Sequence, residues 1–100
     1  MRLAGKVAMV TGGGAGIGRA IVLAMAREGA DVLIPDIQMA NAETVVAEVQ
    51  SLGRRAAALR TDVTKESDIE AAIAEGIRSL GRIDILVNNA GVIPALGHPF

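Results

Sequence analysis

Five glycines stand close together in the segment Thr11-Gly12-Gly13-Gly14-Ala15-Gly16-Ile17-Gly18. The apolar run over residues 6–10 before it is typical of a short buried strand. Residues 19–28 after it are mostly strong helix formers. Glycine permits positive φ and lets a ligand approach the backbone, and a helix start presents free N–H groups and a positive dipole end to a pyrophosphate. The segment therefore predicts a nucleotide-binding loop between a strand and a helix.

The composition is that of a small globular protein rich in small aliphatic residues. Of 100 residues, 51% are hydrophobic and 1% aromatic, which suits a parallel sheet covered by helices on both faces. A net charge of −1 gives no support for a nucleic-acid or membrane partner. The absence of cysteine agrees with the cytosol, and neither a spanning run nor a signal-peptide pattern is present. We therefore expect a cytoplasmic protein without nucleic-acid or membrane partners.

Strand-like and helix-like segments alternate along the chain. Three repeats of strand and helix, followed by a strand, predict a parallel sheet connected by right-handed crossovers. The predicted fold class is α/β, a doubly wound parallel sheet with helices on both faces, incomplete at about four strands and three helices. The predicted strands cover residues 6–10, 31–34, 56–61 and 83–88, and the predicted helices cover residues 19–28, 39–52 and 65–80.

Some local features follow from individual residues. Pro35 cannot donate to a sheet ladder, so it is expected at or just past the last paired position of the second strand. Thr64 is expected to cap the third helix. The apolar run over residues 85–87 is expected to form an open edge. Helical spacing predicts a buried stripe on the third helix, made of Ile69, Ile73, Ile77 and Leu80.

The glycine pattern by itself is a weak signal. Gly14-x-Gly16-x-Gly18 differs from the general dinucleotide fingerprint G-x-G-x-x-G, and a glycine-rich turn is often only a tight connection. The strand before the loop, the helix after it and an acidic residue further along favour the dinucleotide. A P-loop is excluded, because no Gly-Lys-Ser/Thr sequence is present.

Asp36 lies eighteen positions after Gly18, near the spacing of a carboxylate that binds the ribose of a dinucleotide. A turn aspartate after Pro35 is the alternative. If it binds ribose, Asp36 repels a 2′-phosphate about 4 Å away by roughly 4 kcal/mol per charge pair at an effective dielectric constant of about 20. Neither Ala15 nor the positions beside Asp36 carry a basic residue. NAD is therefore favoured over NADP.

Three motifs in this order resemble the short-chain dehydrogenase/reductase family. They are Thr11-Gly12 followed by Gly16-Ile17-Gly18, then Asp62-Val63, then Asn88-Asn89-Ala90-Gly91. The first and last motifs lie about seventy positions apart, and together they are far more specific than either alone. The resemblance covers essentially all of the chain and implies a Rossmann-type fold.

The resemblance also implies roles for particular residues. Asp62 contacts the adenine and Val63 lines its pocket, while Asn89, Ala90 and Gly91 pass beside the ribose and Asn88 helps to tie strands together. These residues, the glycine loop and the residues at the end of the second strand together form the expected cofactor site. The expected cofactor-binding residues are Gly12, Gly14, Ala15, Gly16, Ile17, Gly18, Asp36, Ile37, Asp62, Val63, Asn89, Ala90 and Gly91.

The family's catalytic Ser, Tyr and Lys find no counterpart here, because the chain has no tyrosine and its two lysines belong to the predicted first strand and third helix. We therefore name no catalytic residue and no metal ligand. Residues 1–100 are interpreted as the N-terminal part of a single NAD-binding domain, inactive alone, with the catalytic part absent. The parent enzyme would be an NAD-dependent oxidoreductase acting on CH–OH groups of an alcohol or ketone, and a homo-oligomer, a dimer or tetramer.

Two other functions stay open at this point. One is a dinucleotide-binding module without catalysis, either a sensor or an inactive relative. The other is a methyltransferase that uses the glycine loop for adenosylmethionine. The motif at residues 88–91 argues against the methyltransferase.

Overall fold

The structure is a computed structural model, and it describes residues 1–89. Four strands and three helices alternate within these residues, which confirms the predicted fold class. The first helix begins at Gly16, three positions before the predicted start, so that the last glycines of the loop already belong to it. The elements are β1 Val7–Thr11, α1 Gly16–Arg27, β2 Asp31–Asp36, α2 Met39–Ser51, β3 Ala56–Arg60, α3 Glu66–Leu80 and β4 Ile85–Asn88.

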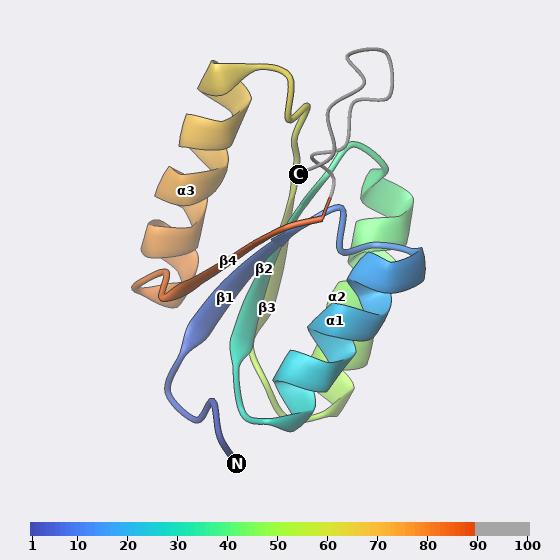
Figure 1. Ribbon diagram of the computed structural model, residues 1–100, viewed down its shortest axis with the longest axis vertical. Helices are drawn as coiled ribbons and strands as arrows, with labels where there is room; N and C mark the ends of the chain where they lie inside the picture. Colours follow the sequence, from blue (N-terminus) through green and yellow to red (C-terminus); the bar gives the residue numbers. More distant parts are fainter. Residues whose placement is uncertain (90–100) are drawn as a thin grey trace.

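The four strands form one parallel sheet in the order β3-β2-β1-β4. The chain proceeds from β1 through β2 to β3 at one edge, and then crosses to the far side of β1 (Figure 1). Successive strands are therefore added on one side of β1 as far as β3 and on the opposite side with β4. In open α/β sheets, ligands bind in the crevice at the carboxyl ends of the strands beside such a change of side.

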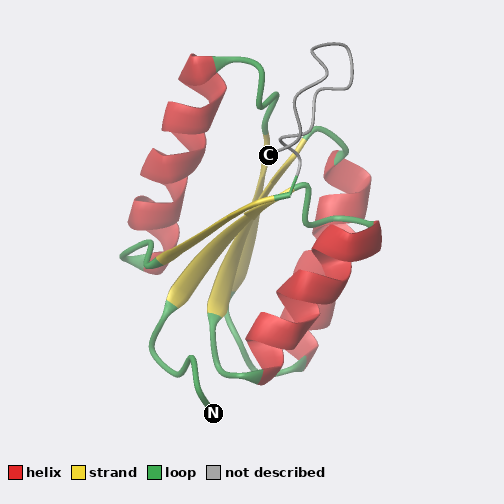
Figure 2. Ribbon diagram, viewed as in Figure 1, coloured by secondary structure: helices red, strands yellow, loops and turns green. Residues whose placement is uncertain are grey.

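The helices cover both faces of the sheet. Helices α1 and α2 lie on one face and α3 lies on the other (Figure 2). All five residues of β1 are buried, because this central strand is covered on both sides. Alternate residues of β1 and β2 therefore enter two separate cores. The core beneath α1 and α2 contains Ala8, Val10, Val32 and Ile34, and the core beneath α3 contains Val7, Met9 and Leu33.

The second strand continues through Pro35 to Asp36, one residue further than proline was expected to allow. Pro35 is paired in register with Leu59, and Asp36 with Arg60. The carbonyl of Pro35 accepts a hydrogen bond from the N–H of Gly12, 2.9 Å away. The N–H and C=O of one strand residue point to the same side, so the missing donor faces the β1 side and does not interrupt the ladder with β3.

The expected cap of the third helix is wrong. Lys65 occupies the N-cap position of α3, and its side chain makes no capping hydrogen bond. Thr64 lies one position earlier and donates its hydroxyl and its N–H to the Asp62 carboxylate instead. Thr64 thus belongs to a turn with Asp62, and α3 starts after this turn, at Glu66.

The expected buried stripe of α3 is also only partly right. Leu80 is buried and Ile69 is half-buried, but Ile73 and Ile77 are 40% and 53% exposed. The helix approaches the sheet through smaller residues, because Ala72 and Gly76 are buried with Leu80. A Cβ atom on Gly76 would lie 2.9 Å from side-chain atoms of Leu33 and Ile83, so glycine allows this close approach.

Leu86 on the edge strand β4 is 63% exposed, which agrees with the expected open apolar edge. It is paired in register with Met9, so it lies on the α3 side of the sheet. Within residues 1–89, no helix is both long and apolar enough to cross a membrane.

Candidate functional site

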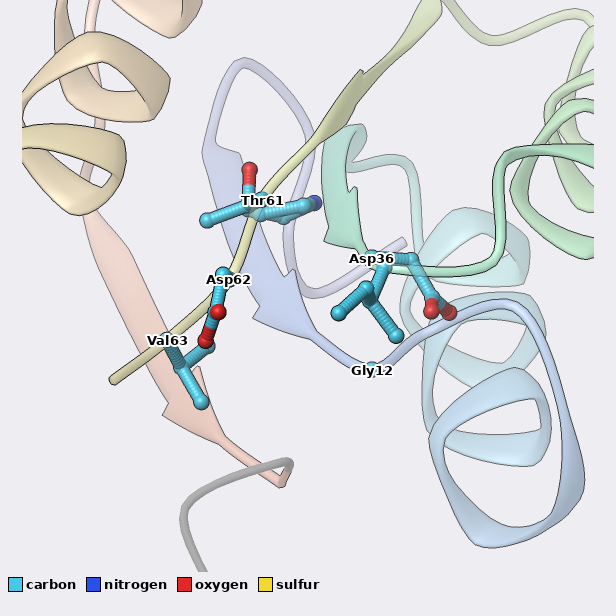
Figure 3. A pocket seen from close by; sticks show the side chains of 7 residues that line it. Gly12, Asp36, Thr61, Asp62 and Val63 are labelled. Carbon is cyan, nitrogen blue, oxygen red and sulfur yellow. The ribbon is translucent and has the colours of Figure 1, made fainter. Parts of the chain in front are cut away.

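A cavity of about 140 Å³ lies where β1, β2 and β3 end. Figure 3 shows that Gly12, Asp36 and Asp62 reach it from three different segments of the chain, each just at or after the end of a strand. The sheet thus brings together residues that are far apart in sequence, at the edge where a doubly wound fold binds its ligands. The lining residues are Gly12, Pro35, Asp36, Ile37, Thr61, Asp62 and Val63.

The glycine loop leads from β1 into the N-terminus of α1. Gly12 has a φ of +66°, a left-handed conformation that favours glycine. Ala15 at the N-cap offers no side-chain hydrogen bond, and no acidic residue lies in the first turn of α1. The N–H groups of this turn therefore have no side-chain acceptor from a capping residue, which leaves the helix start suited to an anion.

Two glycines of the loop are required by close contacts. A Cβ atom on Gly18 would lie 2.1 Å from the carbonyl oxygen of Gly12 and 2.6 Å from Nδ2 of Asn89. A Cβ atom on Gly14 would lie 2.6 Å from Oδ2 of Asp36 and 2.8 Å from the backbone nitrogen of Ala42. The loop is thus packed against the ends of β2 and β4 and against the start of α2.

The carboxylate of Asp36 joins the end of β2 to the glycine loop. Its Oδ2 accepts a hydrogen bond from the N–H of Gly14, and its Oδ1 accepts one from the N–H of Gln38, both at 2.9 Å. An ionised carboxylate has about four acceptor positions. Asp36 therefore keeps acceptor capacity for the hydroxyl groups of a ligand while it holds the loop.

Asp62 is held by the turn that precedes α3. Its N–H donates to Oδ2 of Asp68 at 2.9 Å, and its Oδ1 accepts from the hydroxyl and the N–H of Thr64 at 2.6 and 3.0 Å. The hydroxyl of Thr64 is the main cause that lowers the pKa of the Asp62 carboxyl below its ordinary value, followed by the N–H of Thr64. Asp62 is thus an ionised acceptor beside the cavity near neutral pH.

Hydrogen bonds tie the end of β4 to β1. The hydroxyl of Thr11 lies 3.2 Å from Oδ1 of Asn88 and 3.3 Å from the carbonyl oxygen of Val87. The side-chain amide of Asn89 donates to the carbonyl of Gly12 at 3.3 Å. Asn89 therefore contacts the glycine loop directly, while Ala90 and Gly91 lie outside the described residues.

The other expected cofactor-binding residues differ in how far they are exposed to solvent. Ile17 is 75% exposed on the first turn of α1, and Ile37 is 50% exposed at the cavity. Ala15 and Gly16 are exposed at the start of α1, whereas Val63 is half-buried in the cavity wall.

The sequence analysis missed Pro35 and Thr61 among the lining residues, and Thr64 and Asp68 as partners of Asp62. Pro35 and Thr61 each directly precede an expected site residue, which was the available signal. Among residues 1–89, no group of three or more His, Cys, Asp or Glu side chains is placed to hold a metal ion.

The strand order β3-β2-β1-β4, with a glycine loop between β1 and α1, defines a Rossmann-type doubly wound α/β protein. Residues 6–99 match the family model described as short chain dehydrogenase, and the chain belongs to this family. The sequence is 48% identical over 91 residues to the 7alpha-hydroxysteroid dehydrogenase of Escherichia coli K12, covering 91% of this chain and 36% of that protein.

Solved structures agree with this assignment. A 7 alpha-hydroxysteroid dehydrogenase complexed with NADH and 7-oxo glycochenodeoxycholic acid has a TM-score of 0.84 and 47% identity, over 87% of this chain and 34% of that one. An NAD⁺-bound xylitol dehydrogenase has a TM-score of 0.87 and 36% identity, over 92% of this chain and 35% of that one. The chain thus spans about a third of the length of each of these three relatives.

Proposed function

We propose that this chain is the NAD(H)-binding part of a short-chain oxidoreductase. In the whole protein, hydride moves between the nicotinamide and the carbon of a secondary alcohol or ketone. The observation that carries the proposal is the placement of Asp36, whose carboxylate lies beside the cavity and accepts a hydrogen bond from Gly14 of the glycine loop. A single group thus lies next to the positions expected for the ribose and for the pyrophosphate.

The described residues fit a dinucleotide. A Cβ atom at Gly14 or Gly18 would collide with neighbouring atoms of the protein, so this conformation of the loop requires glycine at both positions. The start of α1, without a side-chain cap, is proposed to hold the pyrophosphate. Asp36 is proposed to accept from the ribose hydroxyls, and Asp62 and Val63 to flank the adenine.

We also propose that NAD is preferred to NADP. A 2′-phosphate near Asp36 would place two negative charges together, at a cost of roughly 4 kcal/mol for each charge pair about 4 Å apart. The basic residue nearest the loop in sequence is Arg19, and its Nε donates to Oε1 of Glu48 on α2 at 2.9 Å. This ion pair supports the preference because Arg19 is already engaged with a carboxylate.

Bound NAD(H) would supply the hydride chemistry, and the residues of this chain would bind and orient it. We name no catalytic residue within the chain. Relatives that match it are described as dehydrogenases and reductases, which favours an oxidoreductase over a dinucleotide-binding module without catalysis. A small alcohol or ketone as substrate, a homo-oligomeric assembly and a cytoplasmic location belong to the same proposal.

The test is a calorimetric titration of the full-length protein with NADH and NADPH side by side. We expect saturable binding of NADH, and binding of NADPH weaker by about two to three orders of magnitude, since about 1.4 kcal/mol corresponds to each factor of ten. Absence of NADH binding would overturn the proposed function. Equal affinities would overturn only the proposed preference for NAD.

A further inference from the structure

Arg60 is the last residue of β3, and it is paired in register with Asp36, the last residue of β2. Neighbouring strands of a sheet lie about 4.8 Å apart. The two residues are therefore direct neighbours, at strand ends that lie side by side (Figure 3). The spacing of residues around Asp36 in the sequence gives no sign of a basic partner on another strand.

Asp36 and Arg60 also lie on the same face of the sheet. Residues two positions apart in a strand share a face. Ile34 belongs to the core beneath α1 and α2, and Ala58 packs against that core. Asp36 and Arg60 each follow two positions later, so both lie on the side of α1 and α2. The hydrogen bond from Gly14 to Asp36 agrees with this, because the glycine loop leads into α1.

The positive charge of Arg60 is not consumed by a neighbouring carboxylate. Arg60 is exposed, and within residues 1–89 its guanidinium takes part in no ion pair and no hydrogen bond. The pKa of the Asp62 carboxyl is lowered first by the hydroxyl and the N–H of Thr64 and, after these, by the charges of Lys65 and Arg60. Arg60 therefore lies within electrostatic range of a carboxylate that lines the cavity.

A guanidinium is always charged, and its planar fork can bind a phosphate through two parallel hydrogen bonds. If the ribose of a dinucleotide lies at Asp36, a phosphate on its 2′-oxygen lies close to the end of β3 as well. The carboxylate of Asp36 repels that phosphate, whereas the guanidinium of Arg60 attracts it. Discrimination between the two cofactors then depends on both residues.

We propose that Arg60 is a specificity-determining residue: from the strand beside Asp36, it binds the 2′-phosphate of NADP(H) and partly offsets the repulsion by the Asp36 carboxylate. This inference rests on the proposed function, because it takes Asp36 as the residue at the ribose. It adds a residue that the expected cofactor-binding set does not contain. It also implies that the protein disfavours NADPH without excluding it.

The experiment measures dissociation constants of the full-length protein for NADH and NADPH by calorimetry. The two cofactors differ only by the 2′-phosphate, so the ratio of their affinities isolates the contacts of that group. The variants are Arg60→Gln, which removes the charge, and Arg60→Lys, which keeps the charge without the planar fork. Arg54→Gln is the matched control, since it removes the same charge near the opposite end of β3.

Arg60→Gln is expected to weaken NADPH binding about 5- to 20-fold and NADH binding about twofold or less, because only NADPH loses a charge-assisted hydrogen bond. Arg60→Lys is expected to lose less, and Arg54→Gln to leave the ratio unchanged. Added salt is expected to reduce the effect of Arg60→Gln, since exposed charges are screened. A merely structural role of Arg60 would weaken both cofactors equally and leave the ratio unchanged, which would overturn the inference.

Asp36→Asn provides a second background, in which NADPH is expected to bind more tightly because the repelling charge is gone. The contribution of Arg60 can be measured there even where the unmodified protein binds NADPH too weakly for calorimetry. Equal NADPH affinities of Asp36→Asn and of the double variant Asp36→Asn with Arg60→Gln would overturn the inference, as would undetectable NADPH binding by Asp36→Asn, while NADH binding is intact. Failure of NADH to bind the unmodified protein would instead overturn the proposed function.

Discussion

Gly14 and Asp36 lie 22 positions apart in the sequence, and the N–H of Gly14 donates to Oδ2 of Asp36 at 2.9 Å. This hydrogen bond fastens the middle of the glycine loop to the end of β2. The same carboxylate receives the N–H of Gln38 through Oδ1. Asp36 thus has a structural role in the loop in addition to its proposed role at the ribose, and substitutions can separate the two.

Asp36→Ala is expected to weaken NADH binding about 10- to 100-fold, because hydrogen bonds to a charged group contribute about 1.5–3 kcal/mol. Asp36→Asn is expected to be milder, since its amide oxygen can still accept from Gly14. Both variants are expected to reduce the ratio of the NADH affinity to the NADPH affinity, because each removes the negative charge of Asp36. Titration of each variant with the two cofactors measures the effect.

The control for the two Asp36 variants is Asp31→Asn. Asp31 lies at the opposite end of β2, and its carboxylate accepts from the N–H and the side chain of Arg55. We expect this variant to leave the ratio of the NADH and NADPH affinities unchanged. An unchanged ratio in Asp36→Ala as well would contradict the proposed role of Asp36.

Gly18→Ala is expected to abolish NADH binding and to lower the free energy of unfolding by about 1–3 kcal/mol or more, because the added methyl group collides with the backbone of Gly12. Gly53→Ala is the matched substitution. Gly53 follows α2 with a φ of +81° and has open space around its Cβ position, so only backbone strain of about 1–2 kcal/mol is expected. Urea unfolding measures the stability and calorimetry the binding.

The two glycine variants overlap in their expected loss of stability, so NADH binding is the informative measurement. Gly53→Ala is expected to bind NADH like the unmodified protein. Normal NADH binding by Gly18→Ala would show that the loop does not need its close contact with Gly12.

Stability is expected to decrease in acid partly through Asp84. Its carboxylate accepts from Nε of Arg82 at 2.8 Å and from the N–H of Val7 at 2.9 Å, and these two bonds, Arg82 first, lower its pKa below the ordinary 3.8. A carboxyl whose pKa is lower in the folded state stabilises the fold above its ordinary pKa and loses this contribution as the pH falls through the folded-state value. The loss therefore begins near pH 4 and continues below it.

Urea unfolding between pH 7 and pH 2.5 is the appropriate measurement. Asp84→Asn is expected to be less stable at neutral pH and to lose less stability on acidification than the unmodified protein. Arg82→Gln is expected to move the pKa of Asp84 back toward its ordinary value, which a carboxyl NMR titration can follow. Identical acid profiles for Asp84→Asn and the unmodified protein would contradict the assignment.

The 100-residue chain, produced on its own, is expected to associate through the edge strand β4. Leu86 is 63% exposed there, on a strand paired on one side only within the described sheet. Leu86→Lys is expected to reduce association, whereas Leu52→Lys at the end of α2, also at an exposed leucine, is not. Size-exclusion chromatography with light scattering checks this. A monomeric chain that unfolds cooperatively at high temperature would refute the expectation.

The order and type of the elements could be predicted because local signals were strong and agreed with one another. The apolar runs at residues 31–34 and 83–88 each followed a helix that ended in glycine. Right-handed crossovers then allow only a few arrangements of a parallel sheet. The observed order β3-β2-β1-β4 is the one expected for a doubly wound fold.

Features that depend on tertiary contacts could not be predicted in the same way. Helical spacing predicts that Ile73 and Ile77 are buried, but Ala72 and Gly76 are buried in their place. A side chain at Gly76 would collide with Leu33 and Ile83, so the helix approaches the sheet closely at this position. Thr64 has the residue type of an N-cap, but the N-cap is Lys65, one position later, and the hydroxyl of Thr64 donates to the carboxylate of Asp62. The buried face of α3 and its first residue thus depend on contacts with residues outside the helix, which local propensity does not describe.

The candidate site was predictable in part. Asp36 and Asp62 were expected at the ends of strands, and the cavity is lined by both. The hydrogen bond from Gly14 to Asp36 was not predictable, because it depends on how far the loop folds back over β2. Pro35 and Thr61 also line the cavity, and the only sequence signal for them was that each directly precedes an expected site residue.

The peptide groups of Gly12 connect the two neighbours of the central strand. Its N–H donates to the carbonyl of Pro35 at the end of β2, and its carbonyl accepts from the side-chain amide of Asn89 beyond β4. A displacement at either flank therefore changes the electronic environment of this one residue. In a nitrogen–proton correlation spectrum, the Gly12 resonance would accordingly act as a reporter for events on both sides of the sheet, and replacement of Asn89 would be detectable there without any added ligand.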